Sequence, residues 1–232
     1  MSRDTTEIAA AKRDAIVNLL ASRHRGPLQR ILVVGCGTGL EAGILARGLG
    51  AETIGIDVGA EFAFDHEGSQ PAVLMPMDAQ RLEFEDAAFD VVYSFHALEH
   101  IPDHRKALSE MSRVLRPGGT FCVGTPNKAR LVGYLGSADP LRCKVRWNLN
   151  DLSMRLRGRW SNEKGAHAGF YADELRELCA ENFGQASEIT DDYYLTLYDG
   201  RRELIRRITS SRLKYLIFPC VYFAGQRVTT GA

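Results

Sequence analysis

The feature that most constrains this chain is a glycine-rich turn, ILVVGCGTG at residues 31–39, between an apolar run and a helical segment. Residues 30–34 predict a buried strand, and residues 40–49 predict a helix. Glycines at 35, 37 and 39 let the backbone turn sharply and let a ligand approach the helix N-terminus, where unpaired N–H groups point outward. The spacing is GxGxG. It therefore differs from the GxGxxG of dinucleotide-binding turns and from the Gly-Lys-Ser/Thr of phosphate loops.

Strands and helices alternate around this turn. Strands are predicted at 30–34, 53–57, 72–77, 89–94 and 120–125, and helices at 4–23, 40–49, 103–115 and 171–183. This alternation is typical of a parallel sheet with helices on both faces. After Pro126 the pattern breaks, and we expect residues 127–168 to be irregular. The tail predicts a basic helix around 201–212 and a final apolar strand near 220–228, which suits an antiparallel hairpin at the sheet edge.

Composition excludes several classes of protein. The chain has 232 residues, 29 basic and 29 acidic side chains and a formal net charge of 0, which does not favour a nucleic-acid partner. Five scattered cysteines without a CxxC pair indicate a reducing compartment. No apolar run is long enough to span a membrane, and the charged N-terminus lacks the apolar core of a signal peptide. We therefore expect a soluble, cytoplasmic protein.

Two acidic residues follow the next strands. Asp57 ends the second predicted strand, and Asp78-Ala79 follows the third. A carboxylate at the first position can accept hydrogen bonds from ribose hydroxyls, and one at the second can bind an adenine amino group. Either acid alone could equally be a helix cap, as the glycines alone could be a tight turn. Three such signals in order at successive strand ends favour a nucleotide-type ligand.

Together these segments resemble class I S-adenosylmethionine-dependent methyltransferases, in the group that includes ubiquinone-biosynthesis O-methyltransferases and natural-product or sugar methyltransferases. The resemblance is carried by ILVVGCGTG (31–39), TIGID (53–57), MDAQRLEFEDAAFDVVYS (77–94), ALEHI (97–101) and LSEMSRVLRPGGTFCVGTPN (108–127). It implies a Rossmann-like α/β fold with a seven-stranded, mostly parallel sheet. It also implies a single domain, with an N-terminal helix (1–29), a cofactor-binding core (30–126), a basic substrate lid (127–170) and a C-terminal helix with closing strands (171–232).

The resemblance implies S-adenosylmethionine as the cofactor. The glycine turn would hold its methionine part, Asp57 its ribose and Asp78 its adenine. The expected cofactor-binding residues are Gly35, Cys36, Gly37, Thr38, Gly39, Asp57, Val58, Asp78, Ala79, Ser94 and Phe95. One departure stands out, because Val33 occupies the place where the family usually has an acid.

The stretch SFHALEHI, residues 94–101, contains the inverted zinc-protease pattern HxxEH. A protease would need a long helix and a third ligand, whereas Pro102 follows at once, so we expect no metal. A divalent ion at His96, Glu99 and His100 stays a minority alternative. We predict that His96 or His100 is a general base or a substrate contact, because imidazole accepts a proton near neutral pH. His167 is a second candidate. The alternative is that these side chains only orient the loop.

The predicted reaction is transfer of a methyl group to a small-molecule acceptor, most simply a hydroxyl oxygen. Residues 128–164 carry nine Lys/Arg against three acids, which suggests an anionic, sugar or lipid-linked acceptor. Peripheral membrane contact is conceivable from the basic segments but is not favoured, and the sequence indicates no oligomeric state. Two alternatives stay open, an NAD(P)-dependent oxidoreductase and a non-catalytic S-adenosylmethionine-binding module.

Overall fold

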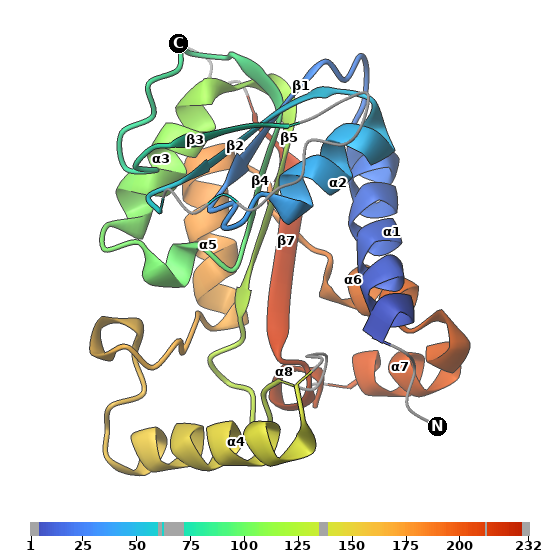
Figure 1. The fold of residues 1–232 in the computed structure, drawn as a ribbon, viewed down its shortest axis with the longest axis vertical. Coiled ribbons are helices and arrows are strands. Elements are labelled where there is room, and N and C mark those ends of the chain that lie inside the picture. The colour runs from blue at the N-terminus through green and yellow to red at the C-terminus, as the bar shows by residue number, and fades with distance from the viewer. Residues whose placement is uncertain (1–4, 60–61, 63–71, 135–138, 212, 229–232) are drawn as a thin grey trace.

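The computed structural model describes residues 5–59, 62, 72–134, 139–211 and 213–228 (Figure 1). Its strands form one seven-stranded sheet in the order β3-β2-β1-β4-β5-β7-β6. The strands are β1 (Arg30–Val34), β2 (Glu52–Asp57), β3 (Val73–Pro76), β4 (Phe89–Phe95), β5 (Leu115–Pro126), β6 (Ser187–Glu188) and β7 (Cys220–Gln226). Strands β1 to β5 pair in parallel, whereas β7 is antiparallel to both β5 and β6. The predicted Rossmann-like sheet with an antiparallel C-terminal pair is therefore confirmed.

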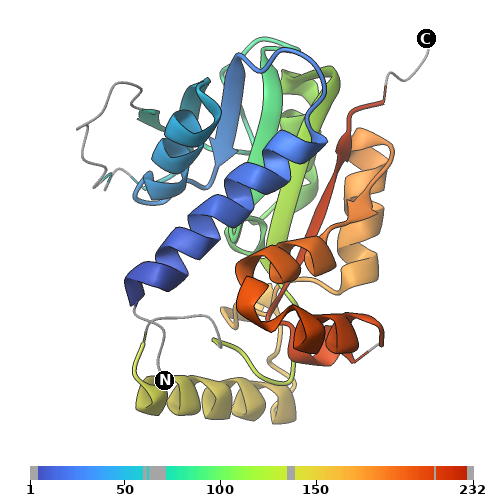
Figure 2. The ribbon, with the colours of Figure 1, turned by 90° about the vertical axis from the view of Figure 1, so that its right-hand side faces the viewer.

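Helices cover both faces of this sheet (Figures 1 and 2). The helices are α1 (Thr5–Arg23), α2 (Leu40–Leu49), α3 (His104–Val114), α4 (Leu141–Leu156), α5 (Ala172–Phe183), α6 (Thr190–Leu197), α7 (Arg202–Thr209) and α8 (Lys214–Ile217), with short 3-10 turns η1 (Leu98–His100), η2 (Asn162–Lys164) and η3 (Asp199–Arg201). None of the described helices is both long and apolar enough to cross a lipid bilayer.

Two separate cores result, one on each side of the sheet. Helices α1, α2 and α6 pack their apolar faces on one side, and α3 and α5 pack on the other. The parallel strands consist of continuous apolar runs because helices cover both faces of the sheet. In β1, for example, residues 31–34 are all buried. Helix α3 begins where the Asp103 carboxylate accepts a hydrogen bond from the Lys106 N–H, and it buries Leu108 and Met111.

The segment predicted as irregular, residues 127–168, is where the structure differs from the sequence analysis. It contains the 16-residue helix α4, and residues 135–138 lie outside the described residues. Helix α4 lies at one end of the molecule, apart from the sheet (Figures 1 and 2). Its apolar side chains occupy two opposite faces, so that the one-sided apolar pattern of an ordinary surface helix is missing from its sequence.

Candidate functional site

The glycine turn adopts backbone angles that other residues rarely take. The φ values of Gly35, Gly37 and Gly39 are 73°, 52° and 87°. A Cβ atom at Gly35 would lie 2.2 Å from the Ala97 Cβ, whereas one at Gly37 would meet nothing within 4 Å. The N–H groups of Gly35 and Cys36 both donate to the Ile56 carbonyl, at 2.8 and 2.9 Å. The turn therefore closes tightly over the carboxyl end of β2.

Both predicted acids lie at this same edge of the sheet. The Asp57 carboxylate accepts hydrogen bonds from the Gly37 N–H at 2.9 Å and the Gly59 N–H at 3.0 Å. The Asp78 carboxylate accepts from the backbone N–H of Gln80 at 2.8 Å and from its side-chain amide. These hydrogen bonds, the side-chain one first, lower the pKa of Asp78. Both carboxylates are thus held in place by hydrogen bonds, and the lowered pKa of Asp78 keeps that side chain ionised at neutral pH.

A cavity at this edge of the sheet, which we call the Asp57 cavity, has a volume of about 250 Å³. It is lined by Val34, Gly35, Ile56, Asp57, Val58, Met77, Asp78, Ala79, Gln80, His96, Ala97, His100, Ile101 and Pro102. Its two carboxylates can accept hydrogen bonds from hydroxyl and amino groups, and its apolar lining suits a flat ring. The bare backbone at Gly35 permits close approach. These residues fit an adenosyl group.

Five of the predicted cofactor-binding residues line the Asp57 cavity: Gly35, Asp57, Val58, Asp78 and Ala79. Six others are placed elsewhere. Gly37, Thr38 and Gly39 belong to the turn itself, and the buried Cys36 lies beside Gly55, where burial raises its pKa to about 11. Ser94 is fully buried within β4, and Phe95 lines a second cavity. The cofactor role of all eleven residues stays a prediction.

The second cavity, which we call the tyrosine cavity, is larger, at about 670 Å³. It is lined by Ile16, Glu41, Phe95, His96, Glu99, Pro126, Arg130, Tyr134, Trp147, Asn150, His167, Tyr193, Tyr194, Leu197, Tyr198, Pro219, Cys220 and Tyr222. These residues come from α1, α2, the end of β4, η1, the loop after β5, α4, the loop before α5, α6 and the start of β7. Aromatic side chains dominate the walls.

His96 belongs to both cavities. Its φ of 57° is left-handed, which is uncommon for a residue with a side chain and concentrates at functional sites. Its Nδ1 atom lies 3.9 Å from the Glu99 Oε1, and its Nε2 atom lies 3.8 Å from the Cys220 Sγ. The imidazole therefore stands at the boundary between the two cavities, with a carboxylate beside one of its nitrogens.

Glu99 is the site residue that the sequence analysis placed only as a possible scaffold or metal ligand. Its carboxylate is buried in the tyrosine cavity, and Oε2 has no hydrogen-bond partner in the described part of the chain. Burial is the main cause of its raised pKa, which the nearby His96 partly offsets. Within the described residues no three His, Cys, Asp or Glu side chains converge as a metal site.

The other two predicted histidines meet across the same boundary. The rings of His100 and His167 lie 4.6 Å apart, edge to face; His100 lines the Asp57 cavity and His167 the tyrosine cavity. Burial, and then the neighbouring His167 and His96, lower the pKa of His100, which favours the neutral imidazole. The structure therefore brings all three predicted histidines together, although their roles stay predictions.

The tyrosine side chains that line the tyrosine cavity were not predicted from the sequence. The Tyr193 and Tyr222 rings contact each other at a tilt, with 4.3 Å between centroids, and Tyr194 stacks on Phe218 at 4.1 Å. Burial raises the pKa of Tyr193, Tyr194 and Tyr222, so these phenols stay protonated. They come from α6 and β7, far along the chain from the histidines. The only sequence signal was an aromatic cluster with no spacing of its own.

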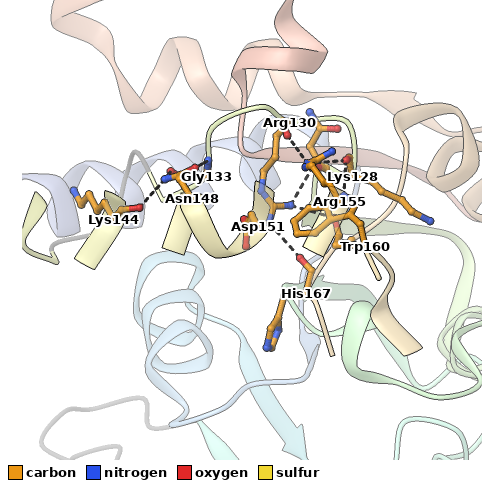
Figure 3. Close-up of polar contacts among 12 residues, drawn as sticks. Lys128, Arg130, Gly133, Lys144, Asn148, Asp151, Arg155, Trp160 and His167 are labelled. Carbon is orange, nitrogen blue, oxygen red and sulfur yellow. Dashed lines mark hydrogen bonds and ion pairs between the residues drawn. The ribbon is translucent and has the colours of Figure 1, made fainter. Parts of the chain in front are cut away.

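Helix α4 is fixed to the rest of the site by a polar network (Figure 3). The guanidinium of Arg130 pairs with Asp151 at 3.4 Å and donates to the carbonyls of Ala168 and His167. Arg155 donates to the Arg130 carbonyl at 2.5 Å, and the Trp160 indole N–H donates to Lys128. This network joins α4 to the loops on both sides of it and so fixes one wall of the tyrosine cavity.

Residues 32–123 match the family model described as a methyltransferase domain. These residues are a class I S-adenosylmethionine-dependent methyltransferase domain. They include the glycine turn, Asp57, Asp78 and the segment from β4 to η1 that carries His96 and His100. The family recognised from the sequence is thereby confirmed over these residues, and S-adenosylmethionine is the methyl donor that such domains use.

Relatives and solved structures agree with this methyltransferase domain. The O-methyltransferase rstn1 of Aspergillus nomiae is 34% identical over 146 residues, covering 56% of this chain and 64% of that protein. YcgJ from Bacillus subtilis has a TM-score of 0.59 at 15% identity, covering 94% of this chain and 99% of that one. Phosphoethanolamine N-methyltransferase 2 of Haemonchus contortus, solved with S-adenosyl-L-methionine, has a TM-score of 0.58 at 17% identity, covering 97% and 58%. These two structures support the fold alone. The chain spans less than two thirds of the length of the curated relatives it matches.

Proposed function

We propose that this chain transfers a methyl group from S-adenosylmethionine, bound in the Asp57 cavity, to a hydroxyl oxygen of a small molecule in the tyrosine cavity. One observation carries the proposal: a single imidazole, that of His96, lines both cavities. A methyl donor and its acceptor must meet at such a boundary, because transfer requires the two reacting atoms in line and in close approach.

Cofactor binding would use the residues at the sheet edge. The Asp57 carboxylate, fixed by two backbone N–H groups, would accept hydrogen bonds from the ribose hydroxyls, and Asp78 would face the adenine amino group. When bound, the cofactor supplies a methyl group already activated on a sulfonium. The protein then has mainly to orient the acceptor and to remove its proton.

His96 is the residue that we propose accepts that proton. Its imidazole faces the tyrosine cavity, and a neutral imidazole is a suitable base near pH 7. The Glu99 carboxylate, 3.9 Å from the Nδ1 atom, would stabilise the imidazolium that forms. His100 and His167 lie beside this pair and would contact the acceptor or orient the His96 ring.

The cavity walls suggest what kind of acceptor fits. Seven aromatic side chains line the tyrosine cavity: Phe95, Tyr134, Trp147, Tyr193, Tyr194, Tyr198 and Tyr222. Arg130 is also in the lining, but its guanidinium already pairs with Asp151. The lining therefore supports a largely apolar or aromatic acceptor with its hydroxyl toward His96, more than a strongly anionic one. Residues 127–170 would act as the wall or lid of this cavity.

Calorimetry and labelled-methyl transfer test the proposal. We expect S-adenosylhomocysteine to bind and NADH not to bind, and we expect label to enter a small molecule when extract fractions, aqueous and lipid, are supplied with labelled cofactor. Tight NADH binding without cofactor binding would indicate an oxidoreductase. Cofactor binding without transfer to any fraction would indicate a non-catalytic module.

Once an acceptor is found, His96→Ala separates catalysis from binding. We expect turnover to fall roughly a hundredfold or more, with the dissociation constant of S-adenosylhomocysteine nearly unchanged. His104→Ala is the matched control, because His104 packs against Phe170 and lines neither cavity as the described residues form them. Equal turnover in His96→Ala and wild type would refute the proposed base.

A further inference from the structure

Helix α4 carries a row of apolar side chains that face away from the protein. The row, which we call the outer stripe, consists of Leu141, Val145, Leu149, Leu152 and Leu156. Steps of four, four, three and four residues place all five on one helical face. Each of them is between 50% and 81% exposed. Helix α4 lies at an end of the molecule in both ribbon views, with no other described element beyond it (Figures 1 and 2).

The opposite face of α4 is already occupied, so the stripe cannot turn inward. Trp147 and Asn150 line the tyrosine cavity. The Asn148 side chain accepts from the Gly133 N–H at 2.7 Å, and Asp151 pairs with the buried Arg130 (Figure 3). These contacts fix the rotation of the helix about its axis. The outer stripe is therefore a stable feature of the surface.

Positive charge surrounds the stripe. Arg142, Arg146, Arg157 and Arg159 are exposed, and none of them forms an ion pair within the part of the chain that the structure describes. The whole chain has a formal net charge of 0, so this cationic surplus is local. Apolar side chains flanked by unpaired cations complement a surface that combines hydrocarbon with negative charge. A second copy of the chain packed symmetrically through the same face would bring the same cations and would not neutralise them.

We propose that the outer stripe of α4 docks on an anionic lipid surface. The apolar side chains insert among the acyl chains, and the flanking arginines contact the phosphates of the headgroups. This inference does not depend on the proposed reaction, because docking can be measured without turnover. Where both hold, the inner face of the docked helix lines the tyrosine cavity, which places the acceptor site one helix away from the lipid.

Vesicle flotation tests the proposal with the whole chain. We expect binding to vesicles of equal parts phosphatidylcholine and phosphatidylglycerol, and much weaker binding to phosphatidylcholine alone. The paired change Leu149→Gln with Leu152→Gln should lower the partition coefficient roughly a hundredfold, because each buried leucine contributes about a factor of ten. Arg142→Gln with Arg146→Gln should lower binding to the anionic vesicles roughly thirtyfold, because each arginine near the surface contributes about a factor of five.

Leu204→Gln is the matched control. Leu204 is 54% exposed, also lies on a basic helix, α7, and stands beside Glu203 and among arginines. We expect its partition coefficient to stay within about twofold of wild type, in contrast to the α4 leucines. Circular dichroism should show the same melting temperature for all variants, since every substituted side chain is exposed.

Three results would overturn the proposal. The first is failure of the wild-type protein to float with anionic vesicles at low salt. The second is an equal loss of binding in Leu204→Gln and in the α4 leucine pair. The third is a dimer in light scattering that the α4 leucine pair dissociates, which would show that a second copy covers the stripe.

Discussion

Gly35 and Gly37 form a matched pair for testing the glycine turn, because only one of them has a neighbour in the way. Both have positive φ, 73° and 52°, so alanine at either position costs about 1–2 kcal/mol of unfolding free energy. At Gly35 the new Cβ would also lie 2.2 Å from the Ala97 Cβ, whereas at Gly37 it meets nothing within 4 Å. Relieving such a contact in a packed region costs about 1–3 kcal/mol more.

Gly35→Ala should therefore destabilise the protein by about 2–5 kcal/mol and Gly37→Ala by about 1–2 kcal/mol. Urea denaturation followed by far-ultraviolet circular dichroism, without cofactor, measures both. An unchanged m value shows that the denatured state is the same. A loss in Gly37→Ala equal to that in Gly35→Ala would refute the reasoning, because it would mean that the contact with Ala97 does not limit the turn.

Two further predictions concern buried carboxylates. Burial raises the pKa of Glu99 above its ordinary 4.5. At pH values between 4.5 and this raised pKa, the native state therefore keeps a proton that the unfolded chain has lost. The unfolding free energy should fall as pH rises through this range, and Glu99→Gln should abolish this part of the pH dependence in urea denaturation at several pH values. Asp151→Ala leaves the buried guanidinium of Arg130 without its ion-pair partner and should lower the unfolding free energy by about 3 kcal/mol. Asp173→Ala removes an exposed partner of Arg176 and should lower it by less than about 1 kcal/mol. Equal losses of unfolding free energy in urea denaturation would contradict the account.

The sheet and the Asp57 cavity were predictable because their signals are local. A parallel strand buried on both faces is a short apolar run, and the ligand-facing residues stand directly after such runs, as Gly35, Asp57 and Asp78 do. The carboxyl ends of neighbouring parallel strands meet at one edge. Knowing the strands was therefore enough to bring these residues together.

The tyrosine cavity was not predictable for the opposite reason. Its walls come from α1, α4, α6 and β7, and no fixed spacing relates Ile16 to Trp147, Tyr193 or Tyr222. Only the tertiary packing brings them together. Helix α4 was missed because Cys143, Trp147 and Met154 form a second apolar face opposite the outer stripe. Two apolar faces cancel the helical periodicity on which sequence reasoning depends.

A structure of the protein with S-adenosylhomocysteine tests the central claim, that methyl donor and acceptor meet at His96, most directly. The account predicts the adenosyl group in the Asp57 cavity, with its ribose hydroxyls on Asp57, its adenine near Asp78 and its sulfur directed toward the opening that His96 shares with the tyrosine cavity. An adenosyl group in the tyrosine cavity, or a sulfur directed away from His96, would contradict it.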